Sequence, residues 1–444
     1  MTDLAVQLRL PGLRSAQLFE EEARYLAPGT QSVALFSKLV FDRGQGAVLW
    51  DVDGNRYVDL LAGVGVASLG YAHPRYVQAI QDQVAKLHVG SFTSASRAAL
   101  VALIAEVTPG DLNRTQLYSS GAEAVESAIR LARSATGKRE VVGFWGGFHG
   151  KTAGVLPLLG SDFKHGLGTL MPGSYSSPYA RCARCELGLV FDSCHWRCVE
   201  LLERKIALET ANDVAAIIVE PIQGTAGNVV PPPGYLKLLR DVADRIGALL
   251  ICDEMITGFG RTGRMFAVEH DGIVPDILTV GKGFGAGFPM SGVIAREDIA
   301  FAKPWANPSG SSSSYGGNPL ASAAALASLR VVREEGLVEH SRQLGARMLE
   351  RMRRWETELP IVHDVRGRGL MLGFDLVHPG TEELLPKQIT RQIFDGCLER
   401  GVLAMIYNPE VRINPPLVIT EEQAFEALDG IEEVLRDTAS RLTA

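Results

Sequence analysis

Short apolar strands that alternate with helices between about residues 100 and 300 are the feature that most constrains the fold. Continuous runs rich in Val and Ile are typical of strands buried on both faces of a parallel sheet. Such runs stand at 140–144, 215–219, 248–251, 277–280 and 291–295, with helical stretches at 121–133, 196–209 and 234–246. The pattern predicts an α/β fold with a mostly parallel central sheet that is covered by helices.

The regular alternation of strand and helix patterns ends after about residue 326. We expect a helix over about 319–354, with a break at Glu335-Gly336, and then a shorter mixture of strands and helices. This pattern predicts a smaller α+β domain. The expected divisions are an N-terminal segment that joins the small domain (1–70), a large domain (71–325) and a C-terminal small domain (326–444).

Composition and charge exclude some classes of function. The 444 residues carry a formal net charge of −7 and no basic stripe, which argues against a nucleic-acid partner. Gly, Pro or charged residues interrupt the apolar stretches well before about 18 residues, so we expect no membrane span. The N-terminus shows neither a basic nor an apolar signal region, so a cytoplasmic protein is expected.

Two charged residues stand where predicted strands end. Lys282 follows the strand at 277–280 in a glycine-rich run, and Asp253 follows the apolar run at 247–251. Desolvation turns a lysine amine into a nucleophile for aldehydes, and the glycines let a flat cofactor approach the backbone. Ligands bind beyond the carboxyl ends of parallel strands. The pair therefore predicts a pyridoxal phosphate site, in which the lysine holds the aldehyde and the acid faces the ring nitrogen.

A series of motifs, taken in order, resembles the class III (ornithine/4-aminobutyrate type) aminotransferases, which have fold type I of the pyridoxal phosphate enzymes. The likeness covers nearly the whole chain. It is carried by Trp50–Asp59, Ser120–Ala124, Gly147–Gly150, Val219–Gly224, Asp253-Glu254, Gly260–Gly263, Gly281–Gly283, Gly316–Pro319, Arg366–Gly369 and Arg412–Pro416.

The resemblance implies roles at the cofactor. Lys282 matches the lysine that binds the cofactor and shuttles the substrate proton, and Asp253 matches the partner of the ring nitrogen. Ser314 matches a residue that reaches the phosphate from the other subunit, which implies a homodimer with shared active sites. The full cofactor-binding set implied is Ser120, Gly121 and Ala122 at the phosphate, Phe148 stacked on the ring beside His149, and Gln223, Asp253, Lys282 and Ser314.

Three further positions concern the substrate. Arg412 matches the arginine that grips the α-carboxylate of glutamate or 2-oxoglutarate, and Glu220 matches the acid that pairs with this arginine when the substrate lacks that group. Val64 stands where the family often has an aliphatic pocket residue. These matches imply a ping-pong transfer from an amine or ω-amino acid to a 2-oxo acid.

Other functions stay open on the sequence alone. An aminomutase or a decarboxylating transaminase could use the same scaffold, and a catalytically silent scaffold or a metal or redox sensor is an alternative of another class. One position departs from the family, which commonly has Gln three residues after the acid to bond the cofactor's phenolic oxygen. Here that residue is Ile256.

Four cysteines fall within seventeen residues, at Cys182, Cys185, Cys194 and Cys198. In a reducing compartment such spacing is typical of zinc or an iron–sulfur cluster, although reduced or disulfide-paired structural cysteines fit as well. The resemblance offers no assignment for this segment. Cys252 and Cys397 are isolated and are expected in the core.

Overall fold

The computed structural model describes residues 10–160 and 162–443, and the chain divides into two compact units. The large unit is Arg75–Glu339, and the small unit combines Met1–Pro74 with His340–Ala444. The division expected from the sequence at 325/326 falls inside helix α11 (Pro319–Glu334). That helix belongs to the large unit because it packs against α5 (Ala95–Val107).

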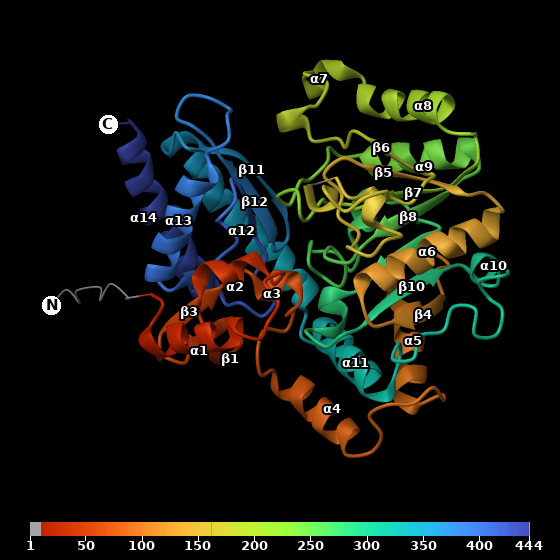
Figure 1. The fold of residues 1–444 in the computed structure, drawn as a ribbon, viewed down its shortest axis with the longest axis horizontal. Coiled ribbons are helices and arrows are strands. Elements are labelled where there is room, and N and C mark those ends of the chain that lie inside the picture. The colour runs from red at the N-terminus through yellow and green to blue at the C-terminus, as the bar shows by residue number, and fades with distance from the viewer. Residues whose placement is uncertain (1–9, 161, 444) are drawn as a thin grey trace. The chain divides into compact units, whose positions relative to one another are not determined.

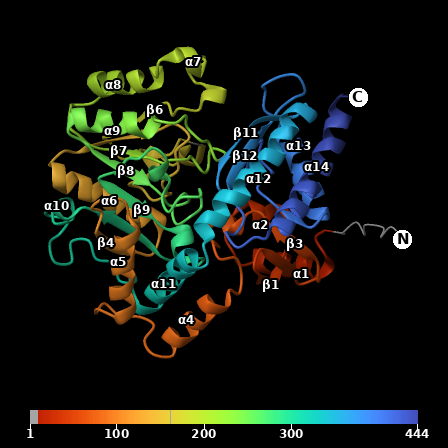
Figure 2. The same cartoon turned by 180° about the vertical axis from the view of Figure 1, so that it is seen from behind.

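A seven-stranded sheet forms the centre of the large unit (Figures 1 and 2). Only β10 runs antiparallel to its neighbours among these strands, so the expected mostly parallel sheet is confirmed. The sequence prediction omitted β4 and β6, which are the two edge strands. In sheet order the strands are β4 (Arg114–Tyr118), β10 (Ser291–Ala295), β9 (Ile277–Val280), β8 (Leu249–Asp253), β7 (Val214–Val219), β5 (Glu140–Phe144) and β6 (Ser174–Ser177).

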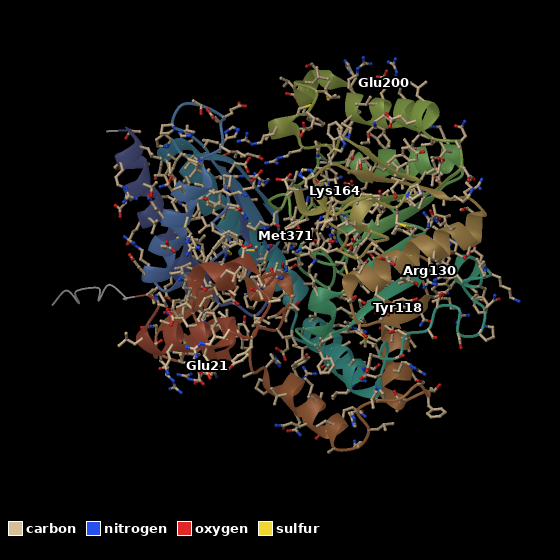
Figure 3. All side chains as sticks on the ribbon, viewed as in Figure 1. Glu21, Tyr118, Arg130, Lys164, Glu200 and Met371 are labelled. Carbon is tan, nitrogen blue, oxygen red and sulfur yellow. The ribbon has the colours of Figure 1, made fainter. Side chains whose placement is uncertain are left out.

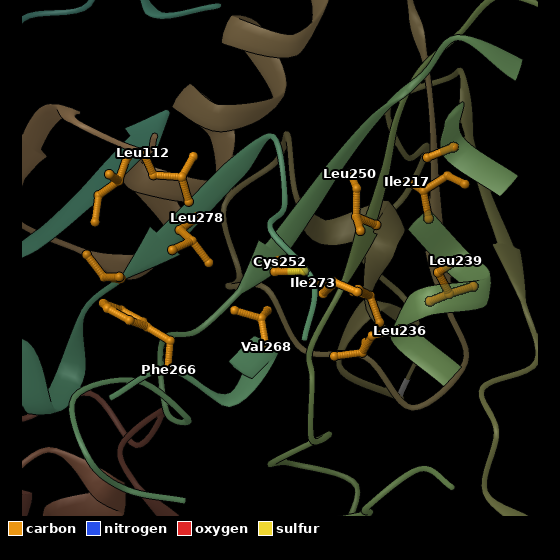
Figure 4. Close-up of a cluster of buried hydrophobic side chains, with 14 of the residues drawn as sticks. Leu112, Ile217, Leu236, Leu239, Leu250, Cys252, Phe266, Val268, Ile273 and Leu278 are labelled. Atoms are coloured by element: carbon orange, nitrogen blue, oxygen red, sulfur yellow. The ribbon is translucent and has the colours of Figure 1, made fainter. Parts of the chain in front are cut away.

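Helices cover both faces of this sheet, and the alternation along β7 shows how. Ala216 and Ile218 pack with helix α6 (Gly121–Thr136) on one face. Ile217 and Val219 face the larger core on the other side (Figure 4). Because successive strand residues point to opposite faces, a strand that is apolar throughout must be covered twice. The second face is covered by α5, α8 (Arg197–Glu209), α9 (Tyr235–Ile246) and α11.

The remaining helices of the large unit are α4 (Pro74–Val84), α7 (Phe191–Cys194) and α10 (Glu297–Ala300). Helix α12 (Leu337–Glu358) begins after α11 at the expected break, where Gly336 has a φ of +66° that a glycine adopts at little cost. The part of the chain that the structure describes contains no helix that is long and apolar enough to cross a membrane.

The described residues of the small unit form two sheets. In the first, the N-terminal strands β1, β2 and β3 are joined by β13, and Val58 of β3 pairs in parallel with Val402. The first sheet comprises β1 (Phe41–Gln45), β2 (Val48–Asp51), β3 (Arg56–Asp59) and β13 (Val402–Leu403); the second comprises β11 (Val362–Arg368), β12 (Met371–Leu376) and β14 (Glu410–Ile413). Its other helices are α1 (Leu13–Ala23), α2 (Ser32–Ser37), α3 (Ala62–Gly65), α13 (Lys387–Glu399) and α14 (Glu421–Thr443).

Polar side chains cover the outer surfaces of both units (Figure 3). Glu21 of α1 and Glu200 of α8 are exposed, whereas Tyr118, at the end of β4, is 2% exposed and Met371 of β12 is fully buried. The charged side chains that are buried therefore need an explanation other than solvation.

Candidate active site

The carboxyl ends of β8 and β9 bring Asp253 and Lys282 to the same edge of the sheet. Asp253 is the last residue of β8 and pairs in register with Thr279 of β9, three residues before Lys282. Lys282 is half-buried and opens a short 3₁₀ turn, Lys282–Gly285, with a φ of +44°. A left-handed lysine is unusual and costs about 1–3 kcal/mol, so the surrounding packing must hold it in this conformation.

Asp253 forms a buried pair with His149. Their side chains are 2% and 1% exposed, and His149 Nδ1 lies 2.7 Å from Asp253 Oδ2. The second carboxylate oxygen of Asp253 accepts a hydrogen bond of 3.1 Å from the backbone N–H of Met255. The carboxylate is therefore held in a fixed orientation.

The pair decides the charge of His149. Burial lowers the pKa of His149, but the hydrogen bond and the charge of Asp253 outweigh it, so that the net pKa lies above its usual value. Lys282 is close enough to act in the opposite direction. The site thus combines a carboxylate, an imidazole whose pKa is raised, and a lysine.

Glu220 follows β7 and is 6% exposed. Its Oε1 accepts a 2.8 Å hydrogen bond from the Phe148 N–H, and its Oε2 accepts a 3.0 Å hydrogen bond from the Gly224 N–H. Burial raises the pKa of Glu220, an effect that the nearby His149 reduces. Because backbone groups hold both oxygens, this carboxylate is a rigid part of the site.

The N-terminus of α6 offers backbone donors. Ser120 caps this helix by accepting a hydrogen bond from Glu123 N (3.3 Å), and its carbonyl accepts one from Ser291 Oγ (2.7 Å). The N–H groups of Gly121 and Ala122 lie in the first helical turn, where no intrahelical acceptor exists. A helix start of this kind suits a phosphate dianion.

Met255 packs closely against two glycines of the site. A Cβ on Gly281 would lie 2.5 Å from Met255 Sδ, and one on Gly121 would lie 3.2 Å from the same atom. These two glycines let the segment after β8 approach the helix start and the turn that holds Lys282. The glycine-rich run around Lys282 therefore has a packing role as well.

Two more predicted cofactor residues lie beside this cluster. Phe148 is half-buried, and its ring makes an edge contact with Phe163 at 6.0 Å between centroids. Gln223 is 2% exposed, and its side-chain amide donates a 2.8 Å hydrogen bond to the Trp145 carbonyl. The structure thus brings Ser120, Gly121, Phe148, His149, Glu220, Gln223, Asp253 and Lys282 to the carboxyl-end side of one sheet.

The structure does not add the remaining predicted residues to this cluster. Ser314 is exposed in the loop before α11, and no hydrogen bond joins it to the cluster within residues 10–160 and 162–443. Val64 lies in α3 with a φ of +67°, and Arg412 lies in β14 opposite Gly373. Both belong to the small unit, so their roles stay predictions.

Sequence reasoning missed two residues near the site. Glu254 is fully buried, and burial raises its pKa to about 7; it accepts hydrogen bonds from Thr257 Oγ1 and from Val268 N. The sequence included it in the motif Asp253-Glu254 but assigned it no role. Tyr179 donates hydrogen bonds of 3.1 Å to the carbonyls of Glu220 and Pro221. No sequence pattern marks this tyrosine, because it lies in an irregular segment.

A metal at the cysteines, one of the alternatives that the sequence left open, is not supported. In the described part of the chain no group of three or more His, Cys, Asp or Glu side chains is arranged to hold a metal ion. Cys185, Cys194 and Cys198 are partly exposed thiols. His195 and Trp196, between Cys194 and Cys198, both have left-handed backbone conformations. Cys252 and Cys397 are buried, as expected.

Comparison with known proteins identifies the family. The family model described as aminotransferase class-III matches residues 30–435. The chain belongs to the class III aminotransferases. It is therefore a pyridoxal phosphate-dependent enzyme, and its Lys282–Asp253 pair and the helix start at Gly121 fit the aldehyde, the ring nitrogen and the phosphate of that cofactor.

The enzyme is similar to relatives with several activities. It is 36% identical over 442 residues to a 4-aminobutyrate aminotransferase of Mycobacterium leprae, covering 96% of this chain and 97% of that protein. It is 33% identical to a leucine/methionine racemase of Thermococcus litoralis, with 96% of each covered. A solved (S)-enantioselective ω-transaminase of Thermomicrobium roseum matches with a TM-score of 0.89 and 32% identity over 95% of this chain and 98% of that one.

Proposed function

We propose that the enzyme transfers an amino group from an amine or an ω-amino acid to a 2-oxo acid, with 2-oxoglutarate as the preferred acceptor. The relatives named 4-aminobutyrate and 5-aminovalerate aminotransferase support a donor that reacts through a terminal amine. The observation that carries the proposal is the rigid, buried Glu220 at the same sheet edge as Lys282.

Each residue of the large unit has a distinct task in this proposal. When bound, pyridoxal phosphate supplies the electron sink for the substrate carbanion. Lys282 binds the cofactor and carries the proton to and from the substrate carbon. Asp253 holds the ring nitrogen protonated, and His149 fixes the orientation of Asp253. Gly121 and Ala122 donate to the phosphate, with Ser120 as the cap, and Gln223 orders the loop beside Phe148.

Substrate choice depends on Glu220 and on Arg412 of the small unit. Since two backbone N–H groups hold Glu220, we propose that Arg412 is the member of the pair that moves when an α-carboxylate enters. The guanidinium then serves an acid with an α-carboxylate in one half-reaction and pairs with Glu220 in the other. Val64 contributes an aliphatic wall.

We propose a homodimer with shared active sites, in which Ser314 serves the phosphate of the partner subunit. Its exposure is consistent with a task outside its own subunit. Several large apolar side chains after α4 are also exposed, including Leu87, Val89 and Phe92, which is 86% exposed. An apolar surface of this kind favours association.

A racemase is the second candidate, because relatives named leucine/methionine and alanine/serine racemase are also about one-third identical. A racemase returns the proton to the opposite face of the same substrate and needs no 2-oxo acid. The aminomutase and the decarboxylating transaminase likewise leave distinct products, a rearranged amine in one case and carbon dioxide in the other.

The ultraviolet–visible spectrum before and after addition of glutamate tests the proposal. We expect the absorption band of the lysine-bound cofactor to give way to that of the aminated cofactor, with one equivalent of 2-oxoglutarate released. A band that glutamate leaves unchanged would contradict the proposed acceptor. Conversion of one enantiomer of an amino acid into the other without 2-oxo acid would establish the racemase instead.

A further inference from the structure

The cysteine segment surrounds a small cavity that the proposed reaction does not use. The cavity has a volume of about 20 Å³ and is lined by residues of the connection between β6 and α8. All four cysteines of this segment, Cys182, Cys185, Cys194 and Cys198, are among the lining residues. Four sulfur-bearing residues therefore share the walls of one space that holds about a single water molecule.

Thiols in this cavity are close enough to influence one another. Burial raises the pKa of Cys198, and the neighbouring Cys194 and Cys185 raise it further. Cys185, Cys194 and Cys198 are residues of intermediate exposure, in contrast to fully buried cysteines. Cys252 and Cys397, by contrast, have no exposed surface and lie outside this group. Reactivity of a cysteine requires exposure, and exposure separates the cavity cysteines from Cys252 and Cys397.

One residue connects the cavity with the candidate active site. Tyr179 lines the cavity and is 5% exposed. Its hydroxyl donates to the carbonyls of Glu220 and Pro221, both at 3.1 Å. The Glu220 carboxylate, in turn, accepts from Phe148 N and Gly224 N. A change in the cavity wall can thus reach the carboxylate through one hydroxyl and one backbone segment.

Aromatic rings pack closely between the cysteine segment and Tyr179. The Tyr179 ring meets the Tyr235 ring edge-on at 5.2 Å, and Trp196 stacks on Tyr235 at 6.3 Å with an interplanar angle of 11°. Trp196 lies in the turn between Cys194 and Cys198. Because close-packed rings transmit displacement rather than absorb it, movement of that turn changes the position of Tyr179.

We propose that the cysteine cavity is a thiol oxidation site, in which Cys198 forms a disulfide with Cys185 or Cys194 and thereby shifts Glu220 through Tyr179. The proposed consequence, altered selection of the 2-oxo acid, rests on the proposed function. The chemical step rests on the cavity, and the link to Glu220 rests on the hydrogen bonds and ring contacts of Tyr179.

The reaction requires a two-electron oxidant, for which a small-molecule disulfide serves. A thiolate in the cavity attacks the disulfide, and the S–S bond breaks to release one small thiol. The second cysteine thiolate then attacks the mixed disulfide, forming the protein S–S bond and releasing the second thiol. Two protein thiols are oxidised, one small disulfide is reduced, and both protons pass to solvent or to the released thiolates.

The first measurement is chemical and independent of activity. The holoenzyme is treated with oxidised glutathione, alkylated, digested and analysed by mass spectrometry. We expect a cross-linked peptide that contains Cys198 together with Cys185 or Cys194, and its loss after dithiothreitol. Cys252 and Cys397 serve as internal controls. Because both are buried, they should react with the alkylating reagent only after the protein is unfolded. Absence of the cross-link, or stoichiometric zinc or iron in the untreated protein, would overturn the proposal.

The second measurement tests the link to Glu220. Oxidation should raise KM for 2-oxoglutarate about fivefold, the size of one displaced hydrogen bond, with a smaller change in kcat. Cys198→Ser should abolish both the cross-link and the change in KM, whereas Cys397→Ser should abolish neither. Tyr179→Phe keeps the ring packing and the cross-link but removes the hydroxyl, so oxidation should no longer change KM.

The outcomes separate the oxidation site from the proposed function. A cross-link with no change in KM in the unmodified chain would overturn the transmission through Tyr179. A cofactor band that glutamate does not change would overturn the acceptor and leave the cross-link as established by mass spectrometry. Oxidation that changes KM equally in Tyr179→Phe would assign the effect to a different route and reject the one proposed here.

Discussion

The strand-end site and the cysteine cavity both gather reactive side chains, but they are positioned in different ways. Asp253 and Lys282 are placed by strand register, since Asp253 pairs with Thr279 across β8 and β9. The four cysteines lie in or beside helical segments, with Cys182 in a 3₁₀ turn, Cys194 at the end of α7 and Cys198 in the first turn of α8, and the described residues form no metal-ligand group there. The sequence therefore predicted that Asp253 and Lys282 follow neighbouring strands, whereas the cysteine spacing left several alternatives open.

The largest expected difference between the two regions is in activity. Lys282→Ala should lower kcat by at least about 10³-fold and remove the absorption band of the lysine-bound cofactor, because no other group supplies both the covalent bond and the proton shuttle. Steady-state kinetics and absorption spectra measure both effects. Lys205→Ala on α8, which breaks only an exposed contact with Glu209, is the matched control and should leave both unchanged. Near-normal turnover by Lys282→Ala would contradict the assignment of the strand-end site as the active site.

The buried pair provides the next largest effect, on stability. His149→Asn leaves the Asp253 carboxylate without its partner, and breaking a buried pair costs about 3–5 kcal/mol. Because the folded-state pKa of His149 is raised, the pair stabilises fully below the unfolded pKa of 6.5 and less as pH rises through the folded pKa.

Thermal unfolding of the cofactor-free protein measures this effect. The midpoint should fall above about pH 6.5 in the unmodified chain and should vary less in His149→Asn. His165→Asn is the control, because that side chain is 71% exposed. If the unfolding midpoints of His149→Asn and His165→Asn depended equally on pH, the His149–Asp253 pair would not be the source of the pH dependence.

Substitution of Glu254 should have a smaller effect on stability, and it should stabilise the protein where His149→Asn destabilises it. Its pKa is raised from 4.5 to about 7, so the folded form holds a proton that the unfolded form has lost, and stability falls as pH rises between these values. Glu254→Gln removes this loss and should stabilise the protein by up to about 3 kcal/mol at pH 8. Thermal unfolding at pH 5 and pH 8 tests it, with exposed Glu203→Gln as the control. A variant that is less stable at pH 8 would contradict the expectation.

The smallest expected effect concerns Ile256, which is 6% exposed and lies against the Gly224 turn, 3.2 Å from a Cβ built on Gly224. Ile256→Gln would supply an amide donor for the phenolic oxygen of the cofactor. We expect the lysine-bound cofactor to lose its proton at lower pH, because a donor stabilises the phenolate. Spectroscopic pH titration checks the shift, and Ile256→Leu is the control. A shift of the same size in Ile256→Leu would assign the effect to packing.

Much of the large unit was predictable because its strands are apolar on both faces. Such runs have few alternatives to a parallel sheet, and Ser120 with Glu123 marks the start of α6. The edge strands β4 and β6 were omitted because their residues are more polar, as in Ser174–Ser177. A run of this kind resembles a loop until its partner strand is known.

The side-chain contacts of the candidate active site could not be predicted from the sequence. Nothing in the sequence shows that Glu220 accepts from Phe148 and Gly224, or that Tyr179 donates to the Glu220 carbonyl, because these groups meet only after the chain folds. The cysteine segment shows the same limit. Its spacing indicated possible ligands, but it did not show that all four cysteines line one cavity.

The pairing of β3 with β13 has a consequence for biosynthesis. The large unit is one continuous stretch, so it can fold as soon as it leaves the ribosome. The sheet of β1, β2 and β3 lacks its fourth strand until Val402-Leu403 has been translated, roughly tens of seconds later. During that interval the free edge of β3 is open to pairing with another chain. The order of synthesis therefore makes the first-made part of the enzyme the last to be completed, and protection of that edge is a task for the nascent chain or its chaperones.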